Sequence, residues 1–243
     1  RGETIAILGD YDVDGASSTA LFARYLRALG SEPIAYIPDR LFEGYGPNVE
    51  AVRRLRESGA SLLITVDCGT TSFEPLAVAR KLGADVIVVD HHQADERLPE
   101  VSALVNPNRQ DDLSGLGQLC AAGVTFMVLV AASRELRRRG AYKSAKHAEP
   151  QLMALLDLVA LATVCDVVPL TGLNKAYVTR GLAIMRQSDN TGLKALLDAA
   201  SLTSPPTPYT LGFVLGPRIN AGGRIGDAGL GSRLLTLDDS VEA

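Results

Sequence analysis

The sequence has no apolar run long enough to cross a membrane. Its longest apolar stretch, AAGVTFMVLVAA at residues 121–132, is far shorter than the ~20 residues that a membrane-spanning helix needs. We therefore predict a buried helix there and no membrane association.

Cysteine is scarce, with Cys68, Cys120 and Cys165 as the only three. They form no CxxC pair and lie in apolar surroundings, which indicates reduced thiols in the core and a cytoplasmic protein. We expect no leader of charged and then apolar residues, because a strand-like run begins at Thr4, three residues after Arg1. We expect the chain to be part of a longer protein.

A basic excess is absent, since 24 Lys and Arg face 28 Asp and Glu for a net charge of −4. Nucleic-acid binding usually shows as a basic excess, so the balance argues mildly against such a partner, although a basic groove above an acidic floor remains compatible with it. With five Phe and seven Tyr, an extensive base-stacking platform is not predicted.

The first half of the chain does contain a regular alternation of strand-like and helix-like runs. Four apolar strand candidates, TIAILGD, PIAYIPD, SLLITVD and DVIVVD, are separated by amphipathic runs that end at Gly30, Gly59 and Gly83. Glycine suits the position after a helix. Near-continuous Val, Ile and Leu in the strands predicts an α/β fold whose parallel sheet is sandwiched by helices.

From about residue 118 the pattern becomes helical, in CAAGVTFMVLVAASRELRRR, QLMALLDLVALATV, NKAYVTRGLAIMRQ and GLKALLDAA. We predict one domain over residues 1–243. Its sheet part covers residues 1–117 and carries most functional side chains, and a mainly helical part covers 118–243.

Acidic residues and imidazoles follow the predicted strands directly. The segments ILGDYDVDG, LLITVDCG and VIVVDHHQ place Asp10, Asp12, Asp14, Asp67, Asp90, His91 and His92 at strand ends, and Asp166 follows the apolar run ALATVC. The carboxyl ends of parallel strands share one edge of a sheet, where ligands bind. We expect these side chains to converge.

Clustered carboxylates favour a metal site. Without cations they would cost several kcal/mol in repulsion and desolvation, and no Lys or Arg is interleaved with them. Oxygen ligands suit Mg²⁺ or Mn²⁺, and imidazoles shift the preference toward Mn²⁺. A carboxylate-rich site for two ions ~4 Å apart is typical of phosphoester hydrolysis.

These acidic residues allow two other interpretations. DYDVDG at residues 10–15 matches the opening of an EF-hand calcium loop, but the twelfth position would be Leu21 instead of Glu and a strand precedes the loop. A single acid at a strand end is more often a helix cap. Several such residues on one predicted edge favour the metal site.

Three segments could contact substrate phosphates. Arg40 lies in PDRLFEGYGPN, Arg109 in NPNRQDD, and Arg218 and Asn220 in GPRINAGGR. Glycine beside arginine allows the backbone to approach a phosphate closely, although such segments are often plain turns.

GDYDVDGASSTAL and VVDHHQ together resemble the DHH phosphoesterase superfamily, named after the Asp-His-His triplet at residues 90–92. Within it the chain is most similar to the RecJ family of bacterial single-strand-specific exonucleases. The resemblance continues through PDRLFEGYG, TVDCGTTS, LVNPNRQDD, LATVCDVVPLTGLNKAYVTRGL and GPRINAGGR. Several motifs in order are specific, whereas the triplet alone would be weak.

The resemblance implies two divalent ions, Mn²⁺ or Mg²⁺, and a set of site residues. The implied ligands are Asp10, Asp12, Asp14, Asp67, His91 and Asp166, and the implied catalytic residues are Asp14, Asp67 and His92. His92 would lie at the scissile phosphate, and Asp90 would orient a neighbouring group.

The activity implied is 5′ to 3′ hydrolysis of single-stranded DNA to mononucleotides in repair and recombination. The alternative is a DHH-type phosphodiesterase or phosphatase acting on short oligonucleotides or cyclic dinucleotides. A pyrophosphatase is disfavoured because Leu8 stands where those superfamily members have histidine, and a non-catalytic scaffold is disfavoured because the acids are kept.

Single-stranded DNA is the expected partner, with a single-strand-binding protein and a helicase as candidate protein partners of a monomer. We expect the second, DHH-associated domain of the family to be missing, because the sequence stops at DDSVEA, where a linking helix should begin.

Overall fold

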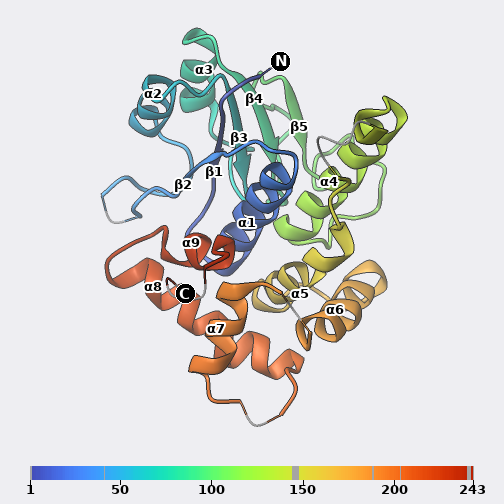
Figure 1. Ribbon diagram of the computed structural model, residues 1–243. Helices are drawn as coiled ribbons and strands as arrows, with labels where there is room; N and C mark the ends of the chain where they lie inside the picture. The colour runs from blue at the N-terminus through green and yellow to red at the C-terminus, as the bar shows by residue number, and fades with distance from the viewer. Residues whose placement is uncertain are drawn as a thin grey trace.

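The computed structural model describes residues 2–40, 42–143, 148–187, 189–202, 204–239 and 242. A sheet with its covering helices lies at the top of Figure 1, and a group of helices lies below it. His147, the histidine outside the Asp-His-His triplet, is not among the described residues.

The sheet is parallel throughout, with strand order β2-β1-β3-β4-β5. Its strands are β1 (Ile5–Leu8), β2 (Ile34–Tyr36), β3 (Leu62–Val66), β4 (Asp85–Val89) and β5 (Ala103–Val105). Apolar residues dominate the central strands because both faces of a parallel sheet are covered.

Helices cover both faces of this sheet (Figure 1). Neighbouring strand residues point to opposite faces, and β1 shows the result. Leu8 joins an apolar cluster with α2 (Val49–Glu57) and α3 (Phe73–Lys81). Ile7 joins a separate, larger cluster on the other face, together with residues of α1 (Val13–Ala28).

The larger cluster connects the sheet to the helical part of the chain, reaching from Ile7 to Leu235. The elements of that part are α4 (Ala121–Arg138), η1 (Ala141–Lys143), η2 (Leu152–Leu155), α5 (Leu156–Cys165), α6 (Gly172–Met185), α7 (Thr191–Ala199), η3 (Thr210–Leu215), α8 (Gly216–Ile225) and α9 (Leu230–Thr236). The predicted α/β class, with a sandwiched parallel sheet and a helical C-terminal portion, is confirmed.

Helix α5 lies at the centre of the helical part, where it contacts α1, α4 and α6. Its residues from Leu156 to Thr163 are all buried, as expected for a helix that is apolar on every side. Asp166 forms its C-terminal cap. The buried helix therefore fixes the position of this acid.

Two elements differ from the sequence prediction. The edge strand β5 was not predicted, because three residues are too few to show a strand period. The plain turn considered for GPRINAGGR is wrong, because this segment forms most of helix α8. Glycine is needed there for packing, since a Cβ at Gly216 would lie 2.6 Å from Cys165 Sγ and one at Gly223 would lie 2.5 Å from the Tyr11 ring.

In the described part of the chain, no helix combines the length and the apolar character that a membrane span requires. The apolar stretch at 121–132 is the first part of α4. All three cysteines are free thiols, and Cys68 and Cys120 are buried.

Candidate metal centre

Acids and imidazoles meet at the carboxyl edge of the sheet. Val66 pairs with Val89, so Asp67 and Asp90 leave neighbouring strands side by side. Ligand atoms lie within 4.8 Å of one another in three groups, namely Asp10, Asp12 and Asp67; Asp14, His91 and Asp166; and Asp67, His91 and His92. The structure thus brings all six predicted ligands together. Two of these groups have no residue in common, so the cluster can hold two ions, and the third group links them through Asp67 and His91.

The turn between β1 and α1 positions the first acids. Asp12 caps α1, its Oδ1 accepting a hydrogen bond from the Gly15 N–H at 2.9 Å, and Asp10 Oδ1 accepts from the Tyr11 N–H at 2.8 Å. A Cβ at residue 15 would lie 2.5 Å from the Asp10 carbonyl oxygen. Only glycine therefore fits at this position of the turn.

The start of α4 holds the buried Asp14. Its Oδ2 accepts a hydrogen bond from the Ala121 N–H at 2.6 Å, and its Oδ1 accepts from the Ala122 N–H at 2.8 Å. The first N–H groups of a helix lack partners within the helix and carry partial positive charge, so they stabilise a carboxylate. Each oxygen can accept a further interaction, so Asp14 keeps capacity for a cation.

His91 is oriented by the same segment. Its Nδ1 lies 3.1 Å from the Leu119 carbonyl oxygen, so Nδ1 carries the proton and Nε2 is left for a ligand role. Nε2 lies 3.3 Å from Asp67 Oδ1 and 3.7 Å from Asp14 Oδ2. The imidazole therefore reaches one acid that follows β3 and one acid in the first turn of α1.

Two buried oxygens in the cluster have no hydrogen-bond partner, namely Asp67 Oδ1 and Asp166 Oδ2. An unpaired buried carboxylate oxygen is costly, and a cation between the acids would remove that cost. Asp67 also has a left-handed backbone with φ of 60°, a conformation that is uncommon for non-glycine residues and is enriched at functional sites. Oxygen-rich ligands with imidazole fit Mn²⁺ or Mg²⁺.

The crowded acids hold protons strongly when no cation is near. Burial, and then repulsion by Asp166, raises the pKa of Asp14 to about 8. Burial and Asp12 raise the pKa of both Asp10 and Asp166 to about 6. The pKa of Asp67 is also raised well above its usual value, by burial and then by Asp14. A divalent ion would displace these protons at neutral pH.

Asp90 differs from the other acids because it holds His92. Its Oδ1 lies 2.8 Å from His92 Nδ1 and also accepts from the His91 N–H, while Oδ2 accepts from the Thr70 N–H. Burial opposes the charged form, but the bonds from His92 and Thr70 outweigh it and lower the pKa of Asp90. The same bond raises the pKa of His92. Asp90 is thus an orienting group, and the His92 side chain is half exposed at the rim.

Two asparagines of the NPNRQDD segment hold the histidine backbone, and the sequence analysis missed them. Asn106 Nδ2 donates to the His92 carbonyl oxygen at 2.8 Å and to Thr70 Oγ1 at 2.9 Å. Asn108 Nδ2 donates to the carbonyl oxygens of His91 at 2.5 Å and Gly117 at 3.0 Å. The sequence gives no clear signal for this role, because the three residues of β5 before them are too few to show a strand pattern.

All four predicted substrate contacts lie on segments that border the cluster. The Arg40 guanidinium lies over the Tyr11 ring, 5.4 Å from its centroid, and donates to the Tyr11 hydroxyl. Asn220 Oδ1 accepts from the Val13 N–H at 3.2 Å. Arg218 is exposed on the same helix, α8.

Arg109 is engaged within the chain. Its Nε and Nη2 donate to both oxygens of Asp111, and Nη1 donates to the Leu104 carbonyl oxygen at 2.9 Å. The guanidinium borders a cleft of about 420 Å³ between β5 and α4, which is lined mainly by apolar side chains such as Leu116 and Met127.

Comparison with known proteins agrees with this geometry. A family model described as "DHH family, N-terminal domain" matches residues 4–163. The single-stranded-DNA-specific exonuclease RecJ of Salmonella typhimurium is 42% identical over 246 residues, covering 100% of this chain and 43% of that protein. Its counterpart in Escherichia coli is 41% identical with the same coverage. The chain thus spans less than half the length of these relatives.

Solved structures give the same result. A crystal structure of exonuclease RecJ bound to manganese superposes with a TM-score of 0.85 and 37% identity, covering 99% of this chain and 58% of that one. The structure of RecJ from Thermus thermophilus in complex with Mn²⁺ superposes with a TM-score of 0.81 and 35% identity, covering 99% of this chain and 33% of that one. The family match, these likenesses and an Asp-His-His triplet inside the ligand cluster show that the chain belongs to the DHH family, with a sequence and fold similar to those of RecJ.

Proposed function

We propose that this chain is the metal-dependent nuclease domain of an exonuclease that degrades single-stranded DNA from 5′ to 3′ into mononucleotides, in DNA repair and recombination. The observation that carries the proposal is the cluster of overlapping ligand groups sharing Asp67 and His91. The RecJ relatives support it, since they cover the whole chain and are named for this substrate. Their structures are described with Mn²⁺ or Mg²⁺.

Two divalent ions would be held by Asp10, Asp12, Asp14, Asp67, His91 and Asp166. When bound, they would supply an activated water and stabilise the charge on the phosphate and leaving oxygens. The chain's contribution is preorganisation, because α4 fixes Asp14 and the Leu119 carbonyl fixes the tautomer of His91. Little reorganisation would remain when substrate arrives.

His92 is the proposed phosphate contact. Asp90 accepts a hydrogen bond from Nδ1, so Nε2 is the nitrogen left for an oxygen of the scissile phosphate, to which it donates when the ring is charged. The same carboxylate raises the pKa of His92, which favours the charged, donating form. Asp90 itself supplies orientation and countercharge.

The single DNA strand would be positioned by side chains around the metal cluster. Arg40 lies beside the β1–α1 turn, and Arg218 and Asn220 lie on α8. Arginine binds phosphate oxygens with two parallel donors. Arg109 remains a predicted contact, although using it would require its bonds to Asp111 to open.

The wider setting also belongs to this proposal. We place the protein in the cytoplasm as a monomer, in keeping with its free thiols. A single-strand-binding protein and a helicase are proposed partners, and a DHH-associated domain is proposed to complete the substrate clamp in the whole protein. Residues 1–117 would supply most of the ligands and residues 118–243 the helical support.

The test is hydrolysis of an oligonucleotide labelled at one end or the other. With Mn²⁺, mononucleotides should be released stepwise from the 5′ end of a single strand, with no release from the duplex or in excess chelator. Cleavage of a dinucleotide alone would favour the alternative phosphodiesterase acting on short oligonucleotides. No metal-dependent cleavage of any of these substrates would contradict the proposal.

A further inference from the structure

Tyr45 lies beside the metal centre, in the segment that joins β2 to α2. Its ring meets the His92 ring edge-on, with the centroids 6.1 Å apart and the planes at 78°. Its hydroxyl donates to the Asp67 carbonyl oxygen at 2.9 Å. The side chain therefore contacts a proposed phosphate-binding residue and a shared ligand at once.

The backbone around Tyr45 keeps the ring in this place. Gly44 and Gly46 on either side have φ of 84° and 71°, which other residues rarely adopt. A Cβ at the buried Gly46 would lie 3.4 Å from Cys68 Cβ, so the segment packs directly against the residues that follow β3. The ring is held at both its hydroxyl and its backbone.

Despite this anchoring, 52% of Tyr45 is exposed. Its polar atom is already satisfied within the chain, so the open surface is aromatic. An anchored aromatic face beside a phosphate site is the surface on which a nucleobase stacks, and such stacking tolerates any base because every base has a π face.

We propose that Tyr45 is the base platform of this site, its exposed ring stacking on the base of the nucleotide whose phosphate lies at His92. The inference rests on the proposed function and deepens it, because it makes a nucleoside phosphate, rather than a phosphate group alone, the unit that the site recognises. Stacking of one base changes binding by about 5- to 100-fold. Binding should therefore depend on the presence of a base but little on its identity.

The ring and the hydroxyl of Tyr45 can be tested separately. Tyr45→Phe removes only the bond to the Asp67 carbonyl, whereas Tyr45→Leu also removes the aromatic face. Tyr209→Leu is the matched control, since it deletes a tyrosine that is 68% exposed and that stacks on Phe213, with ring centroids 4.9 Å apart.

The first readout is kcat/KM, with Mn²⁺, for a single strand with an intact 5′-terminal nucleotide and for the same strand with an abasic terminal nucleotide. Wild type, Tyr45→Phe and Tyr209→Leu should prefer the intact strand by about 5- to 100-fold, and Tyr45→Leu should show almost no preference. A full preference in Tyr45→Leu, or none in wild type, would overturn the inference.

A second readout does not depend on hydrolysis. With Mg²⁺, the fluorescence of 2-aminopurine deoxynucleoside 5′-monophosphate should be quenched on binding to wild type and to Tyr45→Phe, because stacking quenches this base, but not on adding Tyr45→Leu. If wild type quenches the fluorescence but hydrolyses no oligonucleotide, only the proposed function is contradicted. Hydrolysis without quenching by wild type would contradict the base platform alone.

Discussion

The individual carboxylates at this site differ in how fully they are hydrogen-bonded, and this difference indicates different roles. Asp67 has a buried oxygen without a hydrogen-bond partner, whereas both oxygens of Asp90 accept hydrogen bonds from neighbouring groups. The first arrangement is incomplete without a cation, and the second is complete in itself. Residues that look alike in sequence therefore respond differently to substitution.

Asp67→Ala and Asp166→Ala should each abolish hydrolysis, because each removes an oxygen from the ligand groups. In chelator, both variants should unfold at the wild-type temperature or higher, since one of several repelling buried acids is gone. Oligonucleotide hydrolysis and thermal melts in chelator measure the two effects. The control is Asp95→Ala, which changes an exposed acid and should retain activity. Hydrolysis at the wild-type rate by Asp67→Ala or Asp166→Ala would contradict the two-metal site.

Asn108→Ala should weaken Mn²⁺ binding by about 10- to 100-fold, the usual cost of losing a group that orients a metal ligand. The change leaves the carbonyl oxygens of His91 and Gly117 without this donor. Mn²⁺ titration measures the affinity. Asn190→Ala is the control, because that side chain also donates to a carbonyl oxygen, of Leu235, and caps α7. Equal Mn²⁺ affinities in both variants would show that Asn108 does not position the site.

Individual elements differed in how far sequence could predict them. Strands β1, β3 and β4 are apolar runs that are followed by acids. The sequence pattern therefore predicted both that these segments are strands and that their acids share one edge of the sheet. The edge strand β5 is too short for such a pattern. Helix α8 was missed because glycine usually disfavours helix, and here the space beside Cys165 and Tyr11 decides instead.

Gly181→Ala should destabilise the packing of α6 on α5. A Cβ at residue 181 would lie 2.2 Å from the Leu156 carbonyl oxygen and 2.4 Å from Ala160 Cβ. Overpacking of this kind costs about 1–3 kcal/mol, which denaturant unfolding would measure. Gly226→Ala is the matched control because no atom lies within 4 Å of its Cβ position. Equal midpoints for the two variants would argue against this packing.

The whole molecule combines a stable frame with an acidic centre, and this predicts a pH effect in chelator. The folded-state pKa values of Asp10 and Asp166 are raised to about 6 and that of Asp14 to about 8. The folded state then binds more protons than the unfolded state above pH ~4, so stability falls as pH rises from about 4 to 8. Burial lowers the pKa of His91, which makes stability rise with pH. This single group opposes the trend but is outweighed by the three acids.

Thermal melts at several pH values measure this effect. Without metal the melting temperature should fall toward pH 8, and Mn²⁺ should raise it most at high pH, where protons no longer compete for the ligands. A metal-free melting temperature that rises between pH 5 and 8 would contradict the placement of these acids.

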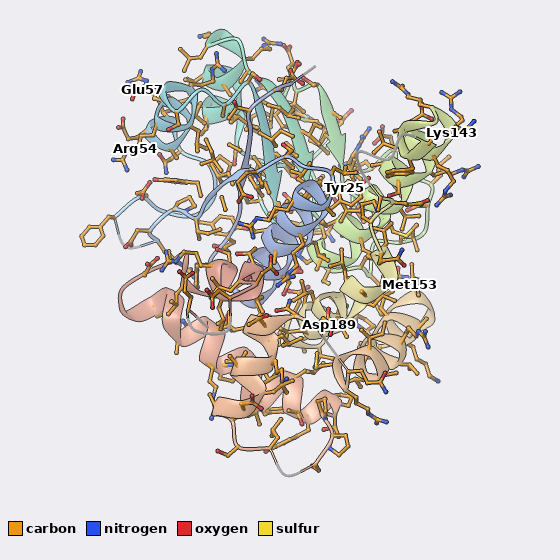
Figure 2. All side chains as sticks on the ribbon, viewed as in Figure 1. Tyr25, Arg54, Glu57, Lys143, Met153 and Asp189 are labelled. Atoms are coloured by element: carbon orange, nitrogen blue, oxygen red, sulfur yellow. The ribbon has the colours of Figure 1, made fainter. Side chains whose placement is uncertain are left out.

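Sequence reasoning brought the right acids to one edge, because parallel strands share a direction and each motif follows a strand. It could not supply contacts made across long separations. Three sets of contacts depend on tertiary packing. They are the hydrogen bonds from Ala121 and Ala122 to Asp14, the hydrogen bonds from the two asparagines to the histidine backbone, and the contact of the Tyr45 ring with His92. A further contact of this kind joins α1 to α4, where the hydroxyl of Tyr25, a residue labelled in Figure 2, lies 3.2 Å from Ser133 Oγ.

The most direct test of the account is the number of Mn²⁺ ions bound per chain, counted by equilibrium dialysis at neutral pH. We expect two ions in the wild type and strongly reduced binding of both in Asp67→Ala, because Asp67 belongs to two ligand groups. His92→Ala should retain Mn²⁺ binding while losing hydrolysis. Binding of no more than one ion by the wild type, or two ions still bound by Asp67→Ala, would contradict the shared two-metal centre.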